Sequence, residues 1–309
     1  MKTFVDSIHL AIAFDQNYLT PFYALIASVF ENNKGNRIVI HCIATGLQEE
    51  QLDQIKQYVD NKKGEICFYT IDEQAASKFV LVSKWTSAVY YRLYFPLLVS
   101  AEVKKLLYLD TDILVLQDLT KLFKTDLEQY PVAAVYDNYV KLAPQLGIHK
   151  EGGYFNSGVL LMNIEQWKKQ QISEKAFQFL MDHPEKINFV DQDALNAVLI
   201  NNWKPLDSRY NTMYSSIPEN SSRKQLSLLT HKIAVLHFTL QRPWQLLCRN
   251  RYRHLYFFYL KKSPLKRYKK YTDFQWKKIP GLVQLRLLEW YYDSPFISKI
   301  WRKVKTNLN

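Results

Sequence analysis

The sequence contains few cysteines, glycines and prolines for its length. Its 309 residues include 3 Cys, 8 Gly and 11 Pro, and no two cysteines form a C-x-x-C pair. The odd number and wide spacing of the cysteines argue against a disulfide framework and favour a reducing compartment. The low glycine and proline counts argue against a low-complexity or collagen-like chain.

Long hydrophobic runs and a secretory leader are also missing. No stretch reaches the ~18 uninterrupted apolar residues of a membrane-spanning helix, so we expect no such helix. Asp6 and His9 interrupt the first apolar run, so we expect no secretory signal. The chain has neither a G-x-G-x-x-G motif nor a Walker lysine motif, which argues against a glycine loop that cradles phosphates.

Positive charge is scarce in most of the chain and concentrated at its end. Residues 1–248 hold 25 Lys and Arg against 26 Asp and Glu, whereas residues 249–309 hold 16 against 3. This change is the clearest boundary in the sequence. We therefore predict a first domain at 1–248 and a basic, aromatic C-terminal region at 249–309.

Strand-like and helix-like stretches alternate through the first domain. Buried strands are predicted at 9–14, 38–44, 66–70, 132–136, 154–163 and 233–238. Helices are predicted from Thr20, which would cap a helix starting at Pro21, over 49–60, 86–95 and 164–182 with a break near Gln171, and from 190. This alternation is typical of an α/β fold with a mainly parallel sheet.

The stretch 106–115 places two carboxylates, Asp110 and Asp112, within an apolar strand. Residues two apart in a strand point to the same face, so the two like charges would repel each other and lose hydration. A divalent cation is the simplest counter-charge. We predict a metal and nucleotide site at the end of this strand, with Thr111 at the bend. The alternative is a pair of capping or solvated turn carboxylates between separate strands.

Two other positions also have both a functional and a structural interpretation. Asp15 and Asn17 follow the first strand and could bind a base or ribose with Tyr18 packed against it, or they could form an ordinary Asx-turn. Arg92 lies in an apolar-rich helix, where a charge is usually paired or functional. The alternative for Arg92 is a side chain that extends along the helix surface to solvent.

Six short motifs follow one another across roughly residues 8–245. They are Phe14-Asp15-Gln16-Asn17-Tyr18, Tyr91-Arg92-Leu93, Leu107-Tyr108-Leu109-Asp110-Thr111-Asp112, Phe155-Asn156-Ser157-Gly158-Val159, Asp191-Gln192-Asp193-Ala194-Leu195-Asn196, and His237-Phe238 followed by Arg242-Pro243-Trp244. In this order they resemble glycosyltransferase family 8, in particular the bacterial lipopolysaccharide galactosyl- and glucosyltransferases and, more distantly, glycogenin.

The resemblance implies a GT-A fold, which is a nucleotide-sugar-binding α/β domain with a mixed, mainly parallel central sheet. It also implies a UDP-hexose donor, a Mn²⁺ ion with Mg²⁺ as the alternative, and retention of anomeric configuration. The implied metal ligands are Asp110, Asp112 and His237. The implied UDP-sugar contacts are Asp15, Asn17, Tyr18, Arg92, Asp110, Thr111, Asp112, Asn156 and Arg242. The implied catalytic residues of the sugar pocket are Gln192, Asp191 and Asp137.

The implied mechanism depends on an amide, Gln192. Retention normally requires a carboxylate nucleophile, but an amide oxygen is a poor one. We therefore favour front-face attack by the acceptor hydroxyl, with the leaving phosphate oxygen taking its proton and Gln192 stabilising positive charge on the sugar ring. Asp191 or Asp137 is the alternative nucleophile.

One segment departs from the family pattern. The family usually has His-x-x-Gly-x-x-Lys-Pro-Trp, whereas the segment from His237 to Trp244 is one residue shorter, lacks the glycine and has Arg242 in place of lysine. Arg242 retains a positive charge that can bind a phosphate, but arginine and lysine differ in shape and hydrogen bonding. The diphosphate contacts of this loop are therefore expected to differ.

The C-terminal region mixes Lys and Arg with aromatic residues, as in Trp301-Arg302-Lys303. This composition suits an anionic membrane surface. We expect a cytoplasmic enzyme at the inner face of the cell membrane, with a saccharide or glycolipid acceptor. One alternative is a helical lid packed on the catalytic domain. Another is a non-enzymatic peripheral protein that binds anionic lipid or nucleic acid, although no recognised nucleic-acid module is present.

Overall fold

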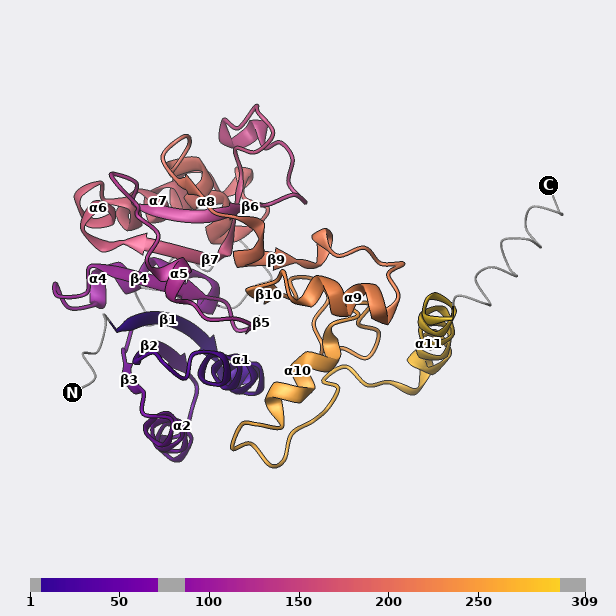
Figure 1. Ribbon diagram of the computed structural model, residues 1–309. Helices are drawn as coiled ribbons and strands as arrows, with labels where there is room; N and C mark the ends of the chain where they lie inside the picture. Colours follow the sequence, from indigo (N-terminus) through magenta and orange to yellow (C-terminus); the bar gives the residue numbers. More distant parts are fainter. Residues whose placement is uncertain (1–6, 72–86, 295–309) are drawn as a thin grey trace.

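A seven-stranded sheet runs through the computed structural model, which describes residues 7–71 and 87–294 (Figure 1). Its strands, in spatial order, are β3 (Glu65–Phe68), β2 (Ile38–Thr45), β1 (Ile8–Asp15), β4 (Lys105–Leu109), β7 (Phe155–Asn163), β6 (Val132–Tyr136) and β8 (Lys204–Pro205). Strand β7 is antiparallel to both of its neighbours, and the other pairs are parallel. The predicted mixed, mainly parallel sheet is confirmed.

A second, three-stranded sheet corrects the interpretation of the two-carboxylate stretch. It consists of β5 (Ile113–Val115), β10 (Val235–His237) and β9 (Thr212–Met213). The single strand predicted over 106–115 is therefore wrong, because β4 and β5 belong to different sheets, but the predicted bend at Thr111 is confirmed, since Thr111 lies in the turn between them. Asp110 N–H still donates to Gly158 O of β7, at 2.9 Å, and the chain then turns to pair with β10. Apolar residues on both sides of a turn give the same pattern as one buried strand.

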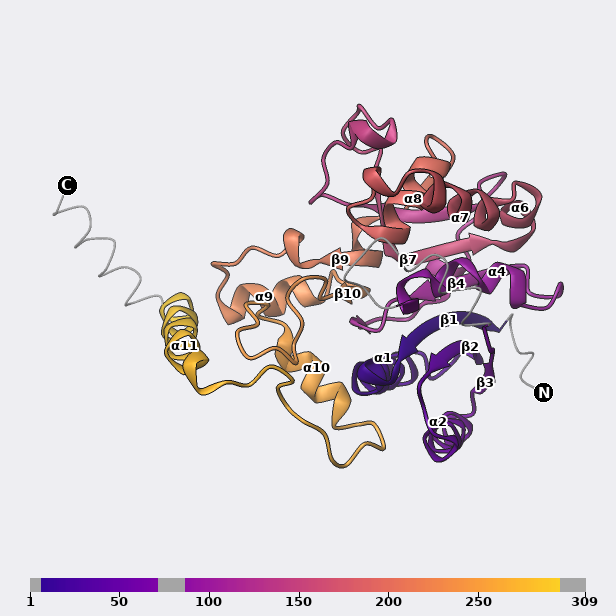
Figure 2. The ribbon, with the colours of Figure 1, turned by 180° about the vertical axis from the view of Figure 1, so that it is seen from behind.

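Helices cover both faces of the large sheet (Figures 1 and 2). The α-helices are α1 (Leu19–Asn32), α2 (Glu49–Asn61), α4 (Phe95–Leu98), α5 (Thr120–Phe123), α6 (Ile164–Lys169), α7 (Ile172–Asp182), α8 (Val190–Val198), α9 (Arg223–Thr230), α10 (Arg253–Leu260) and α11 (Ile279–Asp293). Short 3₁₀ helices are η1 (Gln16–Tyr18), η3 (Ser87–Leu93), η4 (Pro144–Leu146), η5 (Pro184–Lys186), η6 (Ser208–Asn211), η7 (Tyr214–Ser216) and η8 (Trp276–Lys278).

Several predicted helix boundaries differ from the structure. Helix α1 begins at Leu19 rather than after a Thr20 cap, because Asp15 caps the short helix η1 that leads into it. The helix predicted at 86–95 is the 3₁₀ helix η3 followed by α4, and its first residue lies outside the described part of the chain. The break near Gln171 is confirmed, since Gln171 has a φ of 53° between α6 and α7.

Strand β1 divides the core into two layers. Leu10, Ile12 and Phe14 pack on one face with helix α1, and Ala11 and Ala13 pack on the other with the layer that includes α7 and α8. This division follows from the alternation of side chains along a strand. The layer on the α1 side also contains Tyr252, Tyr256, Tyr259 and Leu260, around and within α10. The change of charge after residue 248 therefore does not coincide with a change in packing.

Helix α11 lies at the edge of the molecule, beyond α9, in both views (Figures 1 and 2). Ion pairs connect it to the body: Glu289 pairs with Arg253 at 2.6 Å, and Asp293 pairs with Arg251 at 2.7 Å. Across the described ranges, 7–71 and 87–294, no helix is long and apolar enough to cross a membrane. The predicted tail motif Trp301-Arg302-Lys303 lies outside the described residues.

A histidine pair is buried between neighbouring strands of the large sheet. His41 of β2 lies with its Nε2 atom 2.9 Å from His9 Nδ1 and with its Nδ1 atom 2.8 Å from the Tyr69 hydroxyl. Burial, followed by the nearby His9, lowers the pKa of His41 from 6.5 to about 4. A histidine whose pKa is lowered in the folded state is protonated more readily in the unfolded state, so it destabilises the fold at acidic pH.

We predict that the free energy of unfolding falls as the pH is lowered from 6.5 towards about 4, the window between the two pKa values of His41. In His41→Phe this pH dependence should be weaker, because the buried titrating group is gone. Urea unfolding at a series of pH values measures the effect. The exposed His149, substituted in the same way, is the control, and an equal slope in His41→Phe and wild type would contradict the prediction.

Candidate metal and nucleotide-sugar site

A cavity of about 830 Å³ opens at the carboxyl ends of β1 and β4, where open α/β sheets bind ligands. It brings together all but one of the predicted site residues. Those that line it are Asp15, Tyr18, Arg92, Asp110, Thr111, Asp112, Asp137, Asn156, Asp191, Gln192, His237 and Arg242. The exception is Asn17, which is exposed and is not part of the cavity lining.

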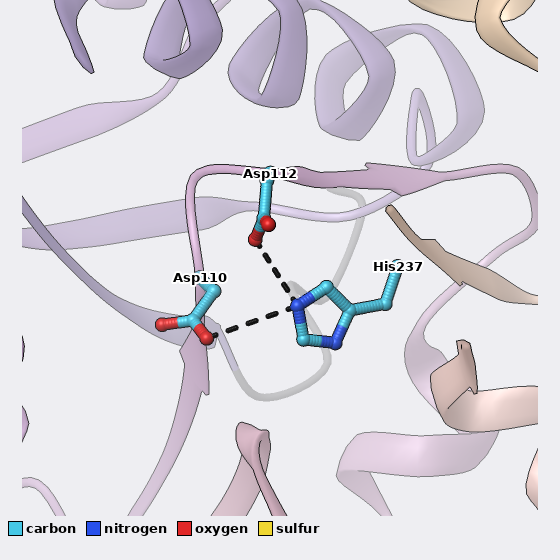
Figure 3. A group of neighbouring side chains, drawn as sticks. All are labelled: Asp110, Asp112 and His237. Atoms are coloured by element: carbon cyan, nitrogen blue, oxygen red, sulfur yellow. Dashed lines mark hydrogen bonds and ion pairs between the residues drawn. The ribbon is translucent and has the colours of Figure 1, made fainter. Parts of the chain in front are cut away.

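Asp110, Asp112 and His237 converge although they come from different segments (Figure 3). His237 Nε2 lies 3.1 Å from Asp112 Oδ1 and 3.9 Å from Asp110 Oδ2. One potential ligand atom from each residue lies within 4.8 Å of the other two. The convergence arises because β10 pairs with β5, which places His237 opposite Ile113, next to the turn that carries both carboxylates.

Charges within this group alter one another's titration. Burial alone would raise the pKa of Asp112, but the charge and hydrogen bond of His237, with Arg242, bring the pKa below its usual value. Burial would likewise lower the pKa of His237, but Asp112 and then Asp110 raise it. The site therefore holds negative charge that a cation can neutralise.

Oxygen and nitrogen atoms of this kind are ligands for Mn²⁺, and carboxylates also suit Mg²⁺. The fit is supported by Arg242, whose buried Nε hydrogen-bonds to no described residue and lies 3.8 Å from Asp112 Oδ2. Its guanidinium packs over the Tyr18 ring, 5.6 Å from the centroid. A free donor beside the carboxylates is suited to a phosphate oxygen held at the same ion.

Arg92 is paired rather than exposed to solvent. The alternative, in which its side chain extends along the helix surface to solvent, is therefore wrong. Its Nε lies 2.7 Å from Asp191 Oδ2, and one terminal nitrogen lies 3.1 Å from Asp110 Oδ1. The other terminal nitrogen donates to Ser157 O and Oγ, and the guanidinium packs over the Tyr108 ring. Arg92 thus fixes the positions of two carboxylates of the cavity, Asp110 and Asp191.

Gln192 is held by hydrogen bonds at both ends of its amide. Its Oε1 accepts from Ser157 N–H at 3.0 Å and from Asn156 Nδ2 at 3.1 Å. Its Nε2 donates to Asp137 Oδ2 at 3.2 Å and to the Tyr154 hydroxyl at 3.1 Å. Because a backbone N–H can only donate, the Gln192 oxygen must face Ser157, which fixes the orientation of the amide.

Asp191 is buried next to this amide. Burial raises its pKa to about 7, and the guanidinium of Arg92 opposes the rise. Its Oδ2 is engaged by Arg92 Nε and by the Ser157 hydroxyl, at 3.3 Å. A carboxylate held in this way is oriented by its neighbours and is a weaker nucleophile than a free one.

The turn after β1 supports the Asx-turn interpretation for the backbone. Asp15 Oδ1 accepts from Asn17 N–H at 2.8 Å and caps η1. Asp15 and Tyr18 nevertheless line the cavity, so the turn also presents two side chains to a ligand. Tyr18 meets Trp244 edge to face, with ring centroids 6.0 Å apart.

Several residues of the site were not identified from the sequence. They are Tyr108, Ser157, Tyr154 and Asn211, and the cavity lining also includes Tyr139, Phe189 and Tyr214. Ser157 and Tyr108 lie within two of the six motifs, so they could have been identified from the sequence. Asn211 had none, because β9 is only two residues long and shows no alternation.

Comparisons with known proteins match most of the chain. The family model described as glycosyl transferase family 8 matches residues 9–248. General stress protein A of Bacillus subtilis is 31% identical, over 82% of this chain and 93% of that protein. Lipopolysaccharide 1,2-glucosyltransferase of Escherichia coli is 31% identical, over 77% of this chain and 74% of that protein.

A solved structure is similar as well. Galactosyltransferase LgtC, in complex with donor and acceptor sugar analogues, has a TM-score of 0.72 and 21% sequence identity, and the match covers 89% of this chain and 100% of that one. This likeness confirms the predicted GT-A fold.

Gly158 allows the three potential ligands to converge. A Cβ at this position would overlap His237 Cε1 and would lie 2.8 Å from Asp110 Oδ2 and 2.9 Å from His237 Nδ1. We predict that Gly158→Ala displaces both side chains and destabilises the fold by about 1–3 kcal/mol, as overpacking does.

The test combines urea unfolding with titration of Mn²⁺ in the presence of UDP. Gly158→Ala should lose stability and bind Mn²⁺ much more weakly than wild type. Gly35→Ala is the matched control, because a Cβ there meets nothing within 4 Å. Unchanged Mn²⁺ binding in Gly158→Ala would show that the three side chains need not hold this arrangement.

Proposed function

Because this chain belongs to glycosyl transferase family 8, we propose that it transfers a hexose, galactose or glucose, from a UDP-sugar to a saccharide acceptor. The transfer proceeds with retention of anomeric configuration and uses Mn²⁺, with Mg²⁺ as the alternative ion. The observation that carries this proposal is the convergence of Asp110, Asp112 and His237 beside the amide and carboxylate cluster around Gln192. One cavity thus offers a place for a diphosphate and a place for a sugar.

The acceptor is a cell-surface glycan or a lipid-linked saccharide. Related proteins named as lipopolysaccharide 1,2-glucosyltransferase and lipopolysaccharide 1,3-galactosyltransferase support this class of acceptor. They also support galactose and glucose as the two candidate sugars.

The chemistry of the donor explains why these groups lie together. A UDP leaving group departs only if its developing negative charge is neutralised. Asp110, Asp112 and His237 would hold the divalent ion, which would act as a Lewis acid on the diphosphate. Arg242 would add a charge-assisted hydrogen bond to a phosphate oxygen.

Residues on the sugar side favour front-face attack. Asp137 accepts hydrogen bonds from Asn156 Nδ2, Gln192 Nε2 and Tyr139 N–H, and Asp191 is paired with Arg92. Neither carboxylate is free, so the acceptor hydroxyl attacks on the side that the leaving phosphate departs from, and a phosphate oxygen takes its proton. The Gln192 carbonyl dipole then stabilises positive charge on the ring. A trapped covalent adduct on Asp137 or Asp191 would overturn this mechanism.

We predict that UDP with Mn²⁺ raises the thermal midpoint of wild type by about 5–10 °C, because ligand at about 100 times its Kd stabilises the native state by roughly 2.7 kcal/mol. Asp110→Ala should show little shift with the same mixture. A matched control is Asp53→Ala, an exposed carboxylate on α2.

The absence of a metal-dependent shift in wild type would defeat the proposed transferase and favour the second candidate, a non-enzymatic peripheral protein. Hydrolysis of a panel of UDP-sugars then identifies the donor. Preference for a sugar other than galactose or glucose would correct the proposed hexose.

We also propose that the protein is cytoplasmic and attached to the inner face of the cell membrane through its C-terminal region. Helix α11 supports this proposal because it exposes an apolar stripe. Glu289 on its inward side is buried and paired with Arg253, while Val283, Leu287 and Trp290, which share one stripe, are exposed. A surface helix normally turns such apolar residues towards the core.

Basic residues accompany the exposed stripe. Lys277 and Lys278 precede α11, and Trp276 beside them is 79% exposed. Aromatic and apolar side chains that point outwards with lysines suit the headgroup region of an anionic bilayer. Each cation near such a surface contributes about 1 kcal/mol.

We predict that a Trp276→Ser, Leu287→Ser, Trp290→Ser variant binds vesicles containing phosphatidylserine at least about 1,000-fold more weakly, since each buried apolar side chain contributes roughly 1.5–3 kcal/mol. Substitution is preferable to deletion of 249–309, because α10 contributes core residues. The control replaces Leu97, Met181 and Leu228, which are also exposed.

Vesicle flotation measures the binding. Equal binding by both variants and wild type would refute attachment through α11. Binding of RNA in place of vesicles would instead support a nucleic-acid partner, which we do not expect.

A further inference from the structure

A buried asparagine outside the recognised motifs contacts the histidine of the candidate metal site. Asn211 ends η6 and is 1% exposed. Its Oδ1 lies 3.0 Å from His237 Nδ1, the ring nitrogen that faces away from both carboxylates. Strand β9, which follows Asn211 directly, pairs with β10 and so brings the asparagine next to His237.

Hydrogen-bonding rules fix the orientation of every group in this contact. Gly158 N–H donates to Asn156 Oδ1 at 3.0 Å, and a backbone N–H can only donate. At the other end, Asn156 Nδ2 lies 3.1 Å from Asp137 Oδ2, and a carboxylate only accepts. The Asn156 oxygen therefore faces Asn211, from which it accepts a hydrogen bond from Nδ2 at 2.8 Å.

The same reasoning determines the hydrogen on His237. Because Asn211 donates through Nδ2, its Oδ1 is the atom that faces His237. An amide oxygen only accepts, so His237 Nδ1 must carry a hydrogen. Nε2 faces Asp110 and Asp112, and because Asp112 Oδ1, 3.1 Å away, only accepts, Nε2 also carries a hydrogen while no cation is bound. A bound cation would take the place of that hydrogen, so the lone pair for the metal would lie on Nε2 while Nδ1–H stays hydrogen-bonded to Asn211. A metal ion binds a histidine through that lone pair.

We propose that Asn211 is a positioning residue that holds His237 as the Nδ1–H tautomer, with Nε2 directed at the metal. Outer hydrogen bonds of this kind usually set both the tautomer and the angle of a ligating histidine. The chain of contacts continues through Asn156 to Asp137 and Gln192, so the metal side and the sugar side share one hydrogen-bond network. The proposal rests on the proposed metal site, but the hydrogen bond from His237 Nδ1–H to Asn211 Oδ1 is a property of the metal-free protein.

The first experiment measures Mn²⁺ affinity in the presence of UDP by the electron paramagnetic resonance of free Mn²⁺. Asn211→Leu should weaken binding about 10–100-fold. Asn211→Asp keeps an acceptor for Nδ1–H and should restore affinity to within a few-fold of wild type. Asn33→Leu is the control: Asn33 is also buried, its side chain hydrogen-bonds to Val29 and Leu119, and it should bind Mn²⁺ as wild type does.

The second experiment observes the hydrogen on His237 Nδ1 directly and needs no metal. Long-range ¹H–¹⁵N spectra of ¹⁵N-histidine protein report the hydrogen on each ring nitrogen separately. The His237 signals are those missing in His237→Gln. Wild type and Asn211→Asp should show a hydrogen on Nδ1 that exchanges slowly with water, and in Asn211→Leu this hydrogen should exchange rapidly or be lost.

The outcomes separate this proposal from the proposed function. A His237 ring without a hydrogen on Nδ1 in wild type, or wild-type Mn²⁺ affinity in Asn211→Leu, would overturn the role of Asn211. Failure of wild type to bind Mn²⁺ would instead defeat the proposed metal site, and the spectra would still decide whether Asn211 holds the hydrogen on Nδ1. If Asn211→Leu does not fold, weak Mn²⁺ binding by Asn211→Asp would count against the proposal.

Discussion

Like charges at the carboxyl end of β4 are the constraint on which the rest of the site depends. Asp110 and Asp112 lie close together, and Asp191 is tied to Asp110 through Arg92. Removing a charge from water without a partner costs several kcal/mol, so each of these carboxylates needs a cation. His237 supplies the counter-charge to Asp112. The positions of η3 and β10 therefore follow as much from charge as from apolar packing.

The electrostatic argument was correct even though the geometry behind it was not. The sequence showed that Asp110 and Asp112 required a counter-charge, and the structure provides one in His237. The expectation that both side chains share one face of a strand was wrong, since they occupy the turn between β4 and β5. A pattern of apolar residues indicates burial, but it does not say which neighbouring strand each half will pair with.

Longer elements could be predicted and short ones could not. The strands at the amino-terminal end and the break at Gln171 followed from alternation and helical spacing. The two-residue strands β8 and β9 had no such signal, and Asn211 was missed with them. Arg92 was ambiguous for a different reason: its partners Asp191 and Ser157 are distant in sequence, and only the fold brings them near. Local sequence patterns therefore do not predict which polar groups, distant in sequence, will pair in the fold.

The division of the turn between two sheets has a mechanical consequence. Asp110 follows the last residue of β4 in the large sheet, whereas Asp112 directly precedes β5 and His237 ends β10, both strands of the small sheet. An ion bound by all three would cross-link the two sheets, in addition to the turn between β4 and β5. Binding of the ion would then reduce the motion of the two sheets relative to each other. Conversely, greater motion between the sheets would weaken the binding of the ion.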